Sequence, residues 1–196
     1  DTDRVFLVGV SNGGHMAYRL GIEAPEHLTA IAPVIAGHPA VWTTGRPGLW
    51  TESVPAPPLS VLVMNGTRDP MIPYDGGQVT VLDQERGEVL SAADTIAWWA
   101  AREGCEGQPS IHQLPDRAPD DGTRISIERR DECNGGAEVT LVKVEGGGHT
   151  WPGGGQYLPE RLIGKVSHDA DGSELLFRFL DRHVDDRAKR EGDGAP

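Results

Sequence analysis

Apolar residues gather in short continuous runs, separated by longer stretches of mixed character. Runs of this length that are rich in β-branched residues are typical of strands buried on both faces, as in a parallel sheet. They predict such strands at residues 4–10, 30–36, 59–65 and 139–144. Residues 124–130 alternate between polar and apolar side chains, which predicts a strand with one exposed face.

Helix signals lie between these runs. Good helix formers follow the first strand from Met16 onward, and Pro25 ends that helix. Ser91, with Asp94 three residues later, makes a start similar to a capping box, and Gly104 closes this second helix. The last helix begins at about Ser173 and places its apolar residues on one stripe, namely Leu175, Leu176, Phe179, Leu180 and Val184. Strands that alternate with helices predict an α/β fold with a mostly parallel sheet and flanking helices.

The length of 196 residues fits one domain of ordinary size. We expect this domain to cover residues 1–186, with 187–196 as a flexible tail. Residues 37–58 are rich in Gly, Pro, Trp and Thr and lack periodicity, which predicts a long surface loop that serves as a lid or a binding loop. The chain begins Asp-Thr-Asp directly before a core strand, without an initiator Met, so we interpret it as a piece of a longer protein.

The formal net charge of −12 at pH 7 narrows the range of partners. Lys and Arg are scattered and form no basic cluster, so we expect neither a nucleic acid nor an anionic membrane surface as a partner. The sequence also has no apolar stretch of the length that a membrane span requires.

The turn after the first strand reads Gly-Val-Ser-Asn-Gly, from Gly9 to Gly13. A dinucleotide-binding turn would need glycine where Ser11 stands, and a P-loop would need Lys and then Ser or Thr where His15 and Met16 stand. The pattern G-x-S-x-G fits both the letters and the strand-turn-helix context, with the two glycines keeping side chains away from an exposed serine hydroxyl. Ser11 is therefore a candidate nucleophile, and a turn without chemistry is the alternative.

A serine nucleophile needs a histidine to accept its proton and a carboxylate to orient that histidine. His149 lies in a glycine-rich loop after the strand at 139–144, where the active sites of open α/β sheets lie. Asp69 follows the third predicted strand in the same way, and Asp75 in the same loop is the alternative acid. Ser11, Asp69 and His149 occur in the chain order Ser, acid, His of α/β-hydrolases.

Seven histidines compete for the role of base, namely His15, His27, His38, His112, His149, His168 and His183. His15 lies in the first turn after the serine and is expected to point along the helix. His183 belongs to the last helix and is expected to face solvent. Both positions suit proton transfer to Ser11 less well than a loop at the carboxyl end of a strand.

Cys105 and Cys133 are the two cysteines of the chain. Neither lies in a predicted strand, and two cysteines without nearby histidines make a poor zinc site. We interpret them as a disulfide, which indicates an oxidising compartment. Two unrelated free thiols are the alternative.

Three segments, GVSNGGHMAYRL, NGTRDPMIPYDGG and GGAEVTLVKVEGGGHTWPGG, together resemble the secreted polyhydroxybutyrate depolymerase and feruloyl esterase family of α/β-hydrolases. The resemblance covers nearly all of the chain up to the last helix. It implies an α/β-hydrolase fold with Ser11 as nucleophile, Asp69 as orienting acid and His149 as general base. It also implies a bridge between Cys105 and Cys133 and a secreted, extracellular protein.

The chain departs from this family at its start. Family members carry early strands before the serine turn, together with a loop that donates one oxyanion-hole N–H, and these are missing here. The backbone N–H of Asn12 supplies one donor, and the second has no source in the sequence. Without the early strands, residues 4–10 form an exposed edge, which we expect to pair with a second copy in a homodimer or with an upstream segment of the same precursor.

These features predict a serine carboxylester hydrolase that acts through an acyl-enzyme, without a cofactor or a metal. The expected substrates are short-chain acyl, polyester or feruloyl-type esters. Trp42, Trp50 and Trp151 are candidates for an apolar or sugar-stacking wall at the site. The alternative is a non-catalytic binding or interaction module derived from a hydrolase.

Overall fold

The computed structural model describes residues 4–40, 57–81 and 83–184. The tail expected at 187–196 and most of the loop at 37–58, with Trp42 and Trp50, therefore lie outside the described residues. No helix in the described ranges combines the length and the apolar character needed to cross a bilayer.

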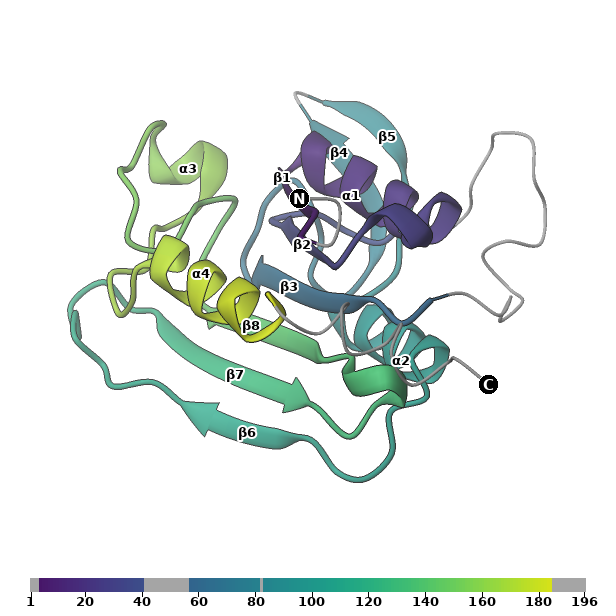
Figure 1. The fold of residues 1–196 in the computed structure, drawn as a ribbon. Coiled ribbons are helices and arrows are strands. Elements are labelled where there is room, and N and C mark those ends of the chain that lie inside the picture. Colours follow the sequence, from purple (N-terminus) through teal and green to yellow (C-terminus); the bar gives the residue numbers. More distant parts are fainter. Residues whose placement is uncertain (1–3, 41–56, 82, 185–196) are drawn as a thin grey trace, which may run out of the picture.

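The main sheet contains six strands in the order β1, β2, β3, β8, β7, β6 within the described residues (Figure 1). Their bounds along the chain are β1 Phe6–Val10, β2 Ala30–Val34, β3 Ser60–Gly66, β6 Ser110–Gln113, β7 Arg124–Arg130 and β8 Val139–Glu145. The first four strands of the sheet run parallel, from β1 to β8. β7 and β6 continue the sheet in antiparallel pairing, so the sheet is mixed.

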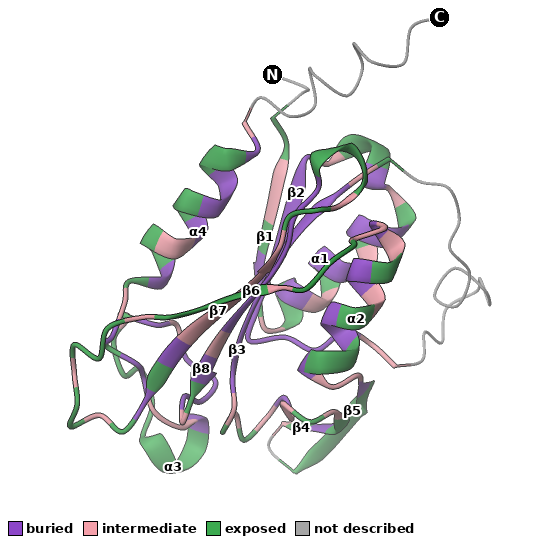
Figure 2. Cartoon of the chain, turned by 90° about the horizontal axis from the view of Figure 1, so that it is seen from below, coloured by how far each residue is buried: buried purple, intermediate pink, exposed green. Residues whose placement is uncertain are grey.

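Helices cover both faces of the sheet, as Figure 2 shows with the sheet seen nearly edge-on. α1 (Asn12–Glu23) and α2 (Ala92–Arg102) lie on one face, and α4 (Gly172–Arg182) lies on the other. Two apolar cores result. One core joins α4 to the sheet and contains Leu176, Phe179, Leu62 and Val142, among others. The other joins α1 and α2 to the sheet and contains Tyr18, Ile96, Trp99 and Val63, among others.

The predicted helix boundaries have a visible cause in the structure. The Ser91 hydroxyl accepts the backbone N–H of Asp94 at 3.0 Å, as the capping pattern predicts. Gly104 follows the end of α2 with φ 61°, a conformation that favours glycine. Asp171 caps α4 by accepting the N–H of Ser173 at 2.7 Å.

Several smaller elements were not predicted. They are the hairpin of β4 (Gly77–Val81) and β5 (Gln84–Val89), the strand β6, the helix α3 (Glu160–Ile163) and the 3-10 turns η1 (Pro25–His27) and η2 (Asn134–Gly136). Figure 2 places α3 and the β4–β5 hairpin at the same end of the sheet.

β1 is an edge strand within the described residues, as expected for residues 4–10, but the prediction that its side chains are buried on both faces is wrong. Within the described residues β1 pairs with β2 alone. Val8 keeps 39% and Val10 keeps 46% of its surface exposed. An apolar run does not distinguish an interior strand from one whose second neighbour is absent, because the residue types suit both.

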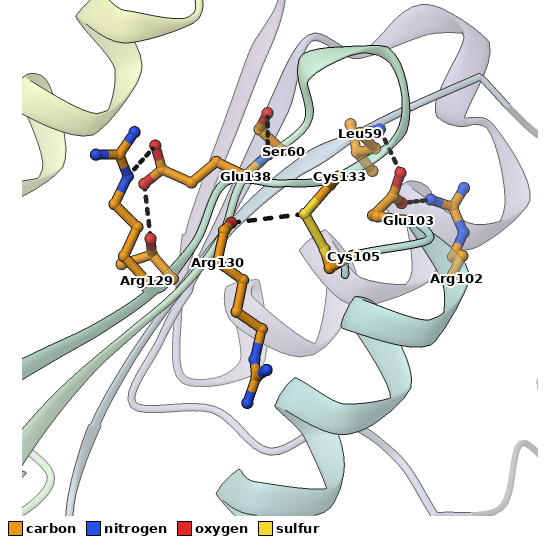
Figure 3. Close-up of a disulfide and its surroundings, with 10 residues drawn as sticks. Leu59, Ser60, Arg102, Glu103, Cys105, Arg129, Arg130, Cys133 and Glu138 are labelled. Atoms are coloured by element: carbon orange, nitrogen blue, oxygen red, sulfur yellow. Dashed lines mark hydrogen bonds and ion pairs between the residues drawn. A yellow bond between two sulfur atoms is a disulfide. The ribbon is translucent and has the colours of Figure 1, made fainter. Parts of the chain in front are cut away.

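The predicted disulfide between Cys105 and Cys133 is present (Figure 3). It ties the segment after α2 to the segment after β7. Backbone hydrogen bonds run beside it, from Asn134 N–H to the Glu103 carbonyl and from Glu106 N–H to the Glu132 carbonyl, both at 2.8 Å. The bridge therefore reinforces a contact that the backbone already makes.

Glu138 is the centre of a buried charge cluster at the amino ends of β3 and β8. Its carboxylate, 2% exposed, contacts Arg182 at 2.7 Å and Arg129 at 3.0 Å. His183 lies 3.5 Å from the same carboxylate and 3.3 Å from the Ser60 hydroxyl. His183 is only 3% exposed, so the expectation that it faces solvent is wrong.

Candidate active site

Ser11 occupies the sharp turn between β1 and α1. Its backbone has φ 53° and ψ −116°, a conformation that residues with a side chain rarely adopt. The turn is held on both sides, because Ser11 N–H donates to the Val34 carbonyl at 2.9 Å and the Ser11 carbonyl accepts the Gly14 N–H at 2.9 Å. Such strain costs on the order of 1–3 kcal/mol and persists where the surrounding structure enforces it. A strained turn between a strand and a helix is the backbone geometry that a nucleophile elbow would require.

Two glycines make this turn possible, and one of them differs from the prediction. A Cβ at Gly9 would lie 2.0 Å from the Gly13 carbonyl oxygen, so no side chain fits there. A Cβ at Gly14 would lie 2.4 Å from the Cβ of Ala36, which follows the end of β2. A Cβ at Gly13 would meet nothing within 4 Å. The steric requirement therefore falls on Gly9 and Gly14, and the prediction that Gly13 must keep a side chain away is wrong.

Asp69 lies in the loop that follows β3, and each of its carboxylate oxygens has a hydrogen-bond partner. Oδ1 accepts the backbone N–H groups of Met71 at 2.8 Å and Ile72 at 2.9 Å. Oδ2 lies 2.8 Å from Nδ1 of His149. Asp75, the alternative acid, is exposed in the same loop.

His149 lies in the loop after β8, with 5% of its surface exposed. Its Nε2 is 3.0 Å from the Ser11 hydroxyl. Two backbone hydrogen bonds hold this loop against the segment at residues 163–165. His149 N–H donates to the Ile163 carbonyl at 2.6 Å, and Gly148 N–H donates to the Lys165 carbonyl at 2.9 Å. A Cβ at Gly148 would lie 2.1 Å from the Ile163 oxygen, which explains the glycine before the histidine.

The structure thus brings the three predicted residues into one hydrogen-bonded line, Ser11, His149, Asp69. Each follows a different one of the parallel strands β1, β8 and β3, so all three meet at the carboxyl edge of the sheet. A hydrogen bond from Nδ1–H to Asp69 leaves Nε2 as an acceptor toward the serine hydroxyl. This arrangement is chemically able to remove a proton from Ser11 and to stabilise the resulting imidazolium.

The structure places the other candidate residues, Asn12, His15 and Trp151, in different surroundings. Asn12 is the first residue of α1, so its N–H has no acceptor within the helix and points out of the helix amino end. His15 is half-buried, and burial is the main effect that lowers its pKa. A hydrogen bond with the Gly37 backbone acts to raise this pKa, and the charge of His149 acts to lower it further. Trp151 packs against the core beneath α4, which gives its indole ring a structural role.

Tyr157 is a residue of this region that the sequence analysis missed. Its hydroxyl donates a hydrogen bond to the His149 carbonyl at 2.8 Å. Only its position eight residues after His149, in the same loop region, hinted at this contact.

An α/β protein with a hydrogen-bonded Ser-His-Asp line at the carboxyl edge of its sheet has the arrangement that hydrolysis through a serine nucleophile requires. Sequence similarity agrees with this class. The chain is 30% identical over 186 residues to the protein named "Putative esterase NocK" of Nocardia uniformis subsp. tsuyamanensis, covering 92% of this chain and 52% of that protein. It is 28% identical over 149 residues to "Feruloyl esterase B" of Piromyces equi, covering 76% of this chain and 25% of that protein.

The two similarities support an ester hydrolase function in general terms. The chain spans about half the length of the first relative and a quarter of the second. No protein-family model matches the chain.

Proposed function

We propose that the protein is a serine carboxylester hydrolase of the α/β-hydrolase type, related to polyhydroxybutyrate depolymerases and feruloyl esterases. The observation that carries this proposal is the pair of contacts of His149, 3.0 Å from the Ser11 hydroxyl and 2.8 Å from Asp69. The strained backbone of Ser11 supports it, since strain of this kind gathers at functional sites.

In the proposed reaction, His149 Nε2 accepts the hydroxyl proton as Ser11 Oγ attacks the ester carbonyl carbon. The tetrahedral oxyanion is stabilised by the Asn12 N–H at the amino end of α1. His149 then gives the proton to the alcohol oxygen, the C–O bond breaks, and the acyl group remains on Ser11. A water molecule, deprotonated by His149, hydrolyses this acyl-enzyme and restores the serine. Asp69 holds the histidine tautomer and stabilises its charged form throughout.

The proposed substrates are short-chain acyl, polyester or feruloyl-type esters, and the proposed location is extracellular. The disulfide between Cys105 and Cys133 supports an oxidising compartment. No cofactor takes part in the steps above.

A fluorophosphonate probe tests the proposal, because it reacts with a serine only when a histidine activates it. We expect stoichiometric labelling of Ser11 in the wild-type chain, hydrolysis of p-nitrophenyl esters, and loss of both in Ser11→Ala and His149→Ala. A chain that neither takes up the probe nor hydrolyses any ester of an acyl-length series would instead be the non-catalytic binding module.

A further inference from the structure

Tyr157 connects the base of the proposed site to an exposed surface. Its hydroxyl donates to the His149 carbonyl at 2.8 Å, while 59% of the residue remains exposed. Burial and then the negative charge of Asp69 raise the pKa of Tyr157, so the hydroxyl stays protonated and can donate. The aromatic ring is therefore anchored at one end beside His149 and exposed along its sides.

The segment around Tyr157 is rigidly attached to the histidine loop. The Gln156 amide donates to the carbonyls of Leu158 at 2.7 Å and Gly164 at 3.0 Å. Ile163 at the end of α3 is fully buried, and its carbonyl accepts the His149 N–H. Residues 156–164 therefore form one unit with His149, although no strand of the sheet contains them.

This segment presents apolar side chains to solvent. Ten large apolar residues are exposed in the described part of the chain, and three of them, Tyr157, Leu158 and Leu162, fall within six positions of this segment. Leu158 is 43% and Leu162 is 46% exposed. Exposed apolar side chains that gather in one short segment, itself hydrogen-bonded to the backbone of His149, suit a ligand-binding surface.

The proposed reaction determines which part of a substrate this surface faces. The alcohol oxygen must lie within hydrogen-bonding distance of His149 Nε2 to receive its proton, so the alcohol group leaves on the histidine side of Ser11. Tyr157 is bonded to the backbone of that same histidine. We propose that Tyr157, Leu158 and Leu162 bind the alcohol part of apolar esters and so determine selectivity for the leaving group. This inference rests on the function proposed above.

A surface for the alcohol part has a specific kinetic consequence. The alcohol is present during acylation and has left before deacylation, so the surface affects kcat/KM and leaves the hydrolysis of a common acyl-enzyme unchanged. Selectivity among acyl groups bound to one alcohol is also unaffected.

The test compares acetates of ethanol, hexanol and 2-naphthylmethanol, three alcohols of similar acidity. In Tyr157→Ala and in the double variant Leu158→Ser, Leu162→Ser, we expect kcat/KM for the hexyl and naphthylmethyl esters to fall roughly tenfold relative to the ethyl ester. Tyr157→Phe keeps the ring and loses only the bond to His149, so it should retain the wild-type order of the three esters. Phe177→Ala, which removes an aromatic residue 62% exposed on α4, is the matched control and should leave all three ratios unchanged.

Three results would overturn the inference while leaving the hydrolase itself intact. They are an unchanged order of the three acetates in both surface variants, an equal loss for all three, or a changed preference among ethyl esters of different acyl length. A wild-type chain that takes up no fluorophosphonate would contradict the proposed function, so the two failures are distinguishable.

Discussion

Asp69 and His149 share one hydrogen bond, Oδ2 to Nδ1 at 2.8 Å, while the other oxygen of Asp69 accepts two backbone N–H groups. The carboxylate is thus unable to rotate away without losing three contacts. Its side chain is 2% exposed and that of His149 is 6% exposed, so the interaction is shielded from water. Because Asp69 is shielded in this way and Asp75 is exposed, substitutions of the two residues should differ in their effect on activity.

Asp69→Asn should lower kcat by about 10³–10⁴, because an amide no longer fixes the histidine tautomer or balances its charge. Asp75→Asn, in the same loop and exposed, is the matched control and should change kcat less than twofold. Steady-state kinetics on a p-nitrophenyl ester measure both. A severe loss in Asp75→Asn beside a mild one in Asp69→Asn would transfer the role of the acid to Asp75.

Alanine substitutions at Gly14 and Gly13, two neighbouring glycines of α1, should differ in their effect on the stability of the fold. Gly14→Ala should destabilise the fold by about 1–3 kcal/mol, because its Cβ would lie 2.4 Å from that of Ala36 and push α1 away from β2. Gly13→Ala should be neutral or stabilise by about 0.5–1 kcal/mol, since its Cβ meets nothing within 4 Å and alanine favours the helix. Urea unfolding at pH 7 gives both values. Equal stability of the two variants would show that α1 can shift without cost.

The positions of the candidate catalytic residues could be predicted because a simple rule connects them. Ser11, Asp69 and His149 each follow an apolar run, and parallel strands carry their carboxyl ends to one edge. The strands that were missed lack this signal. β5 is exposed at five of its six positions and β6 at all four, so no hydrophobic pattern marks them.

The side-chain contacts around the site were beyond the same reasoning. Tyr157 reaches His149 through a loop whose path follows from the buried Ile163 and from hydrogen bonds to Lys165, and periodicity encodes neither. Trp151 is a candidate for a substrate wall from its residue type and its place beside His149, and neither shows that its ring packs against the core beneath α4. His183 is buried because Glu138 and Ser60, distant in sequence, contact it.

Glu138 predicts a pH-dependent stability. Burial acts to raise the pKa of this carboxyl, but hydrogen bonds from His183, Arg182 and Thr140 and the charge of Arg182 outweigh it and hold the pKa well below the ordinary 4.5. A group whose pKa is lowered by folding adds stability above its ordinary pKa, and this stability is lost as the pH falls below that value.

Glu138→Gln should therefore lower the free energy of unfolding by about 3 kcal/mol at pH 7, the low end for a broken buried pair because Arg129 and Arg182 remain partly hydrated. The difference from wild type should narrow between pH 4.5 and pH 3. Glu174→Gln, on the exposed face of α4 and 58% exposed, is the control and should change stability by less than about 0.5 kcal/mol. Urea unfolding midpoints of wild type and variant at pH 7 and at pH 3 measure the effect. A stability difference between the two proteins that stays constant with pH would contradict the prediction.

Within the described ranges β1 has a strand on one side only, which supports our proposal that this strand is an association surface. Val5 and Ser11 direct backbone groups to β2, since the Val5 carbonyl accepts the Thr29 N–H and Ser11 N–H donates to the Val34 carbonyl. By the alternation of a strand, Val8 directs its N–H and C=O to the open edge. A strand edge that no described residue pairs, with exposed apolar side chains, favours pairing with another strand, in the simplest case that of a second copy.

Light scattering should accordingly give a particle mass above that of one chain, and activity per chain should rise with concentration if pairing completes the oxyanion site. Val8→Lys should shift the particle to a monomer, because a charged side chain on an edge strand opposes pairing while the contacts of β1 with β2 remain. Ile111→Lys, at an apolar position on the opposite edge strand β6 that is 66% exposed against 39% for Val8, is the control and should leave the mass unchanged. A wild-type monomer at high concentration, or a monomer produced by Ile111→Lys instead of Val8→Lys, would refute pairing of two copies through β1.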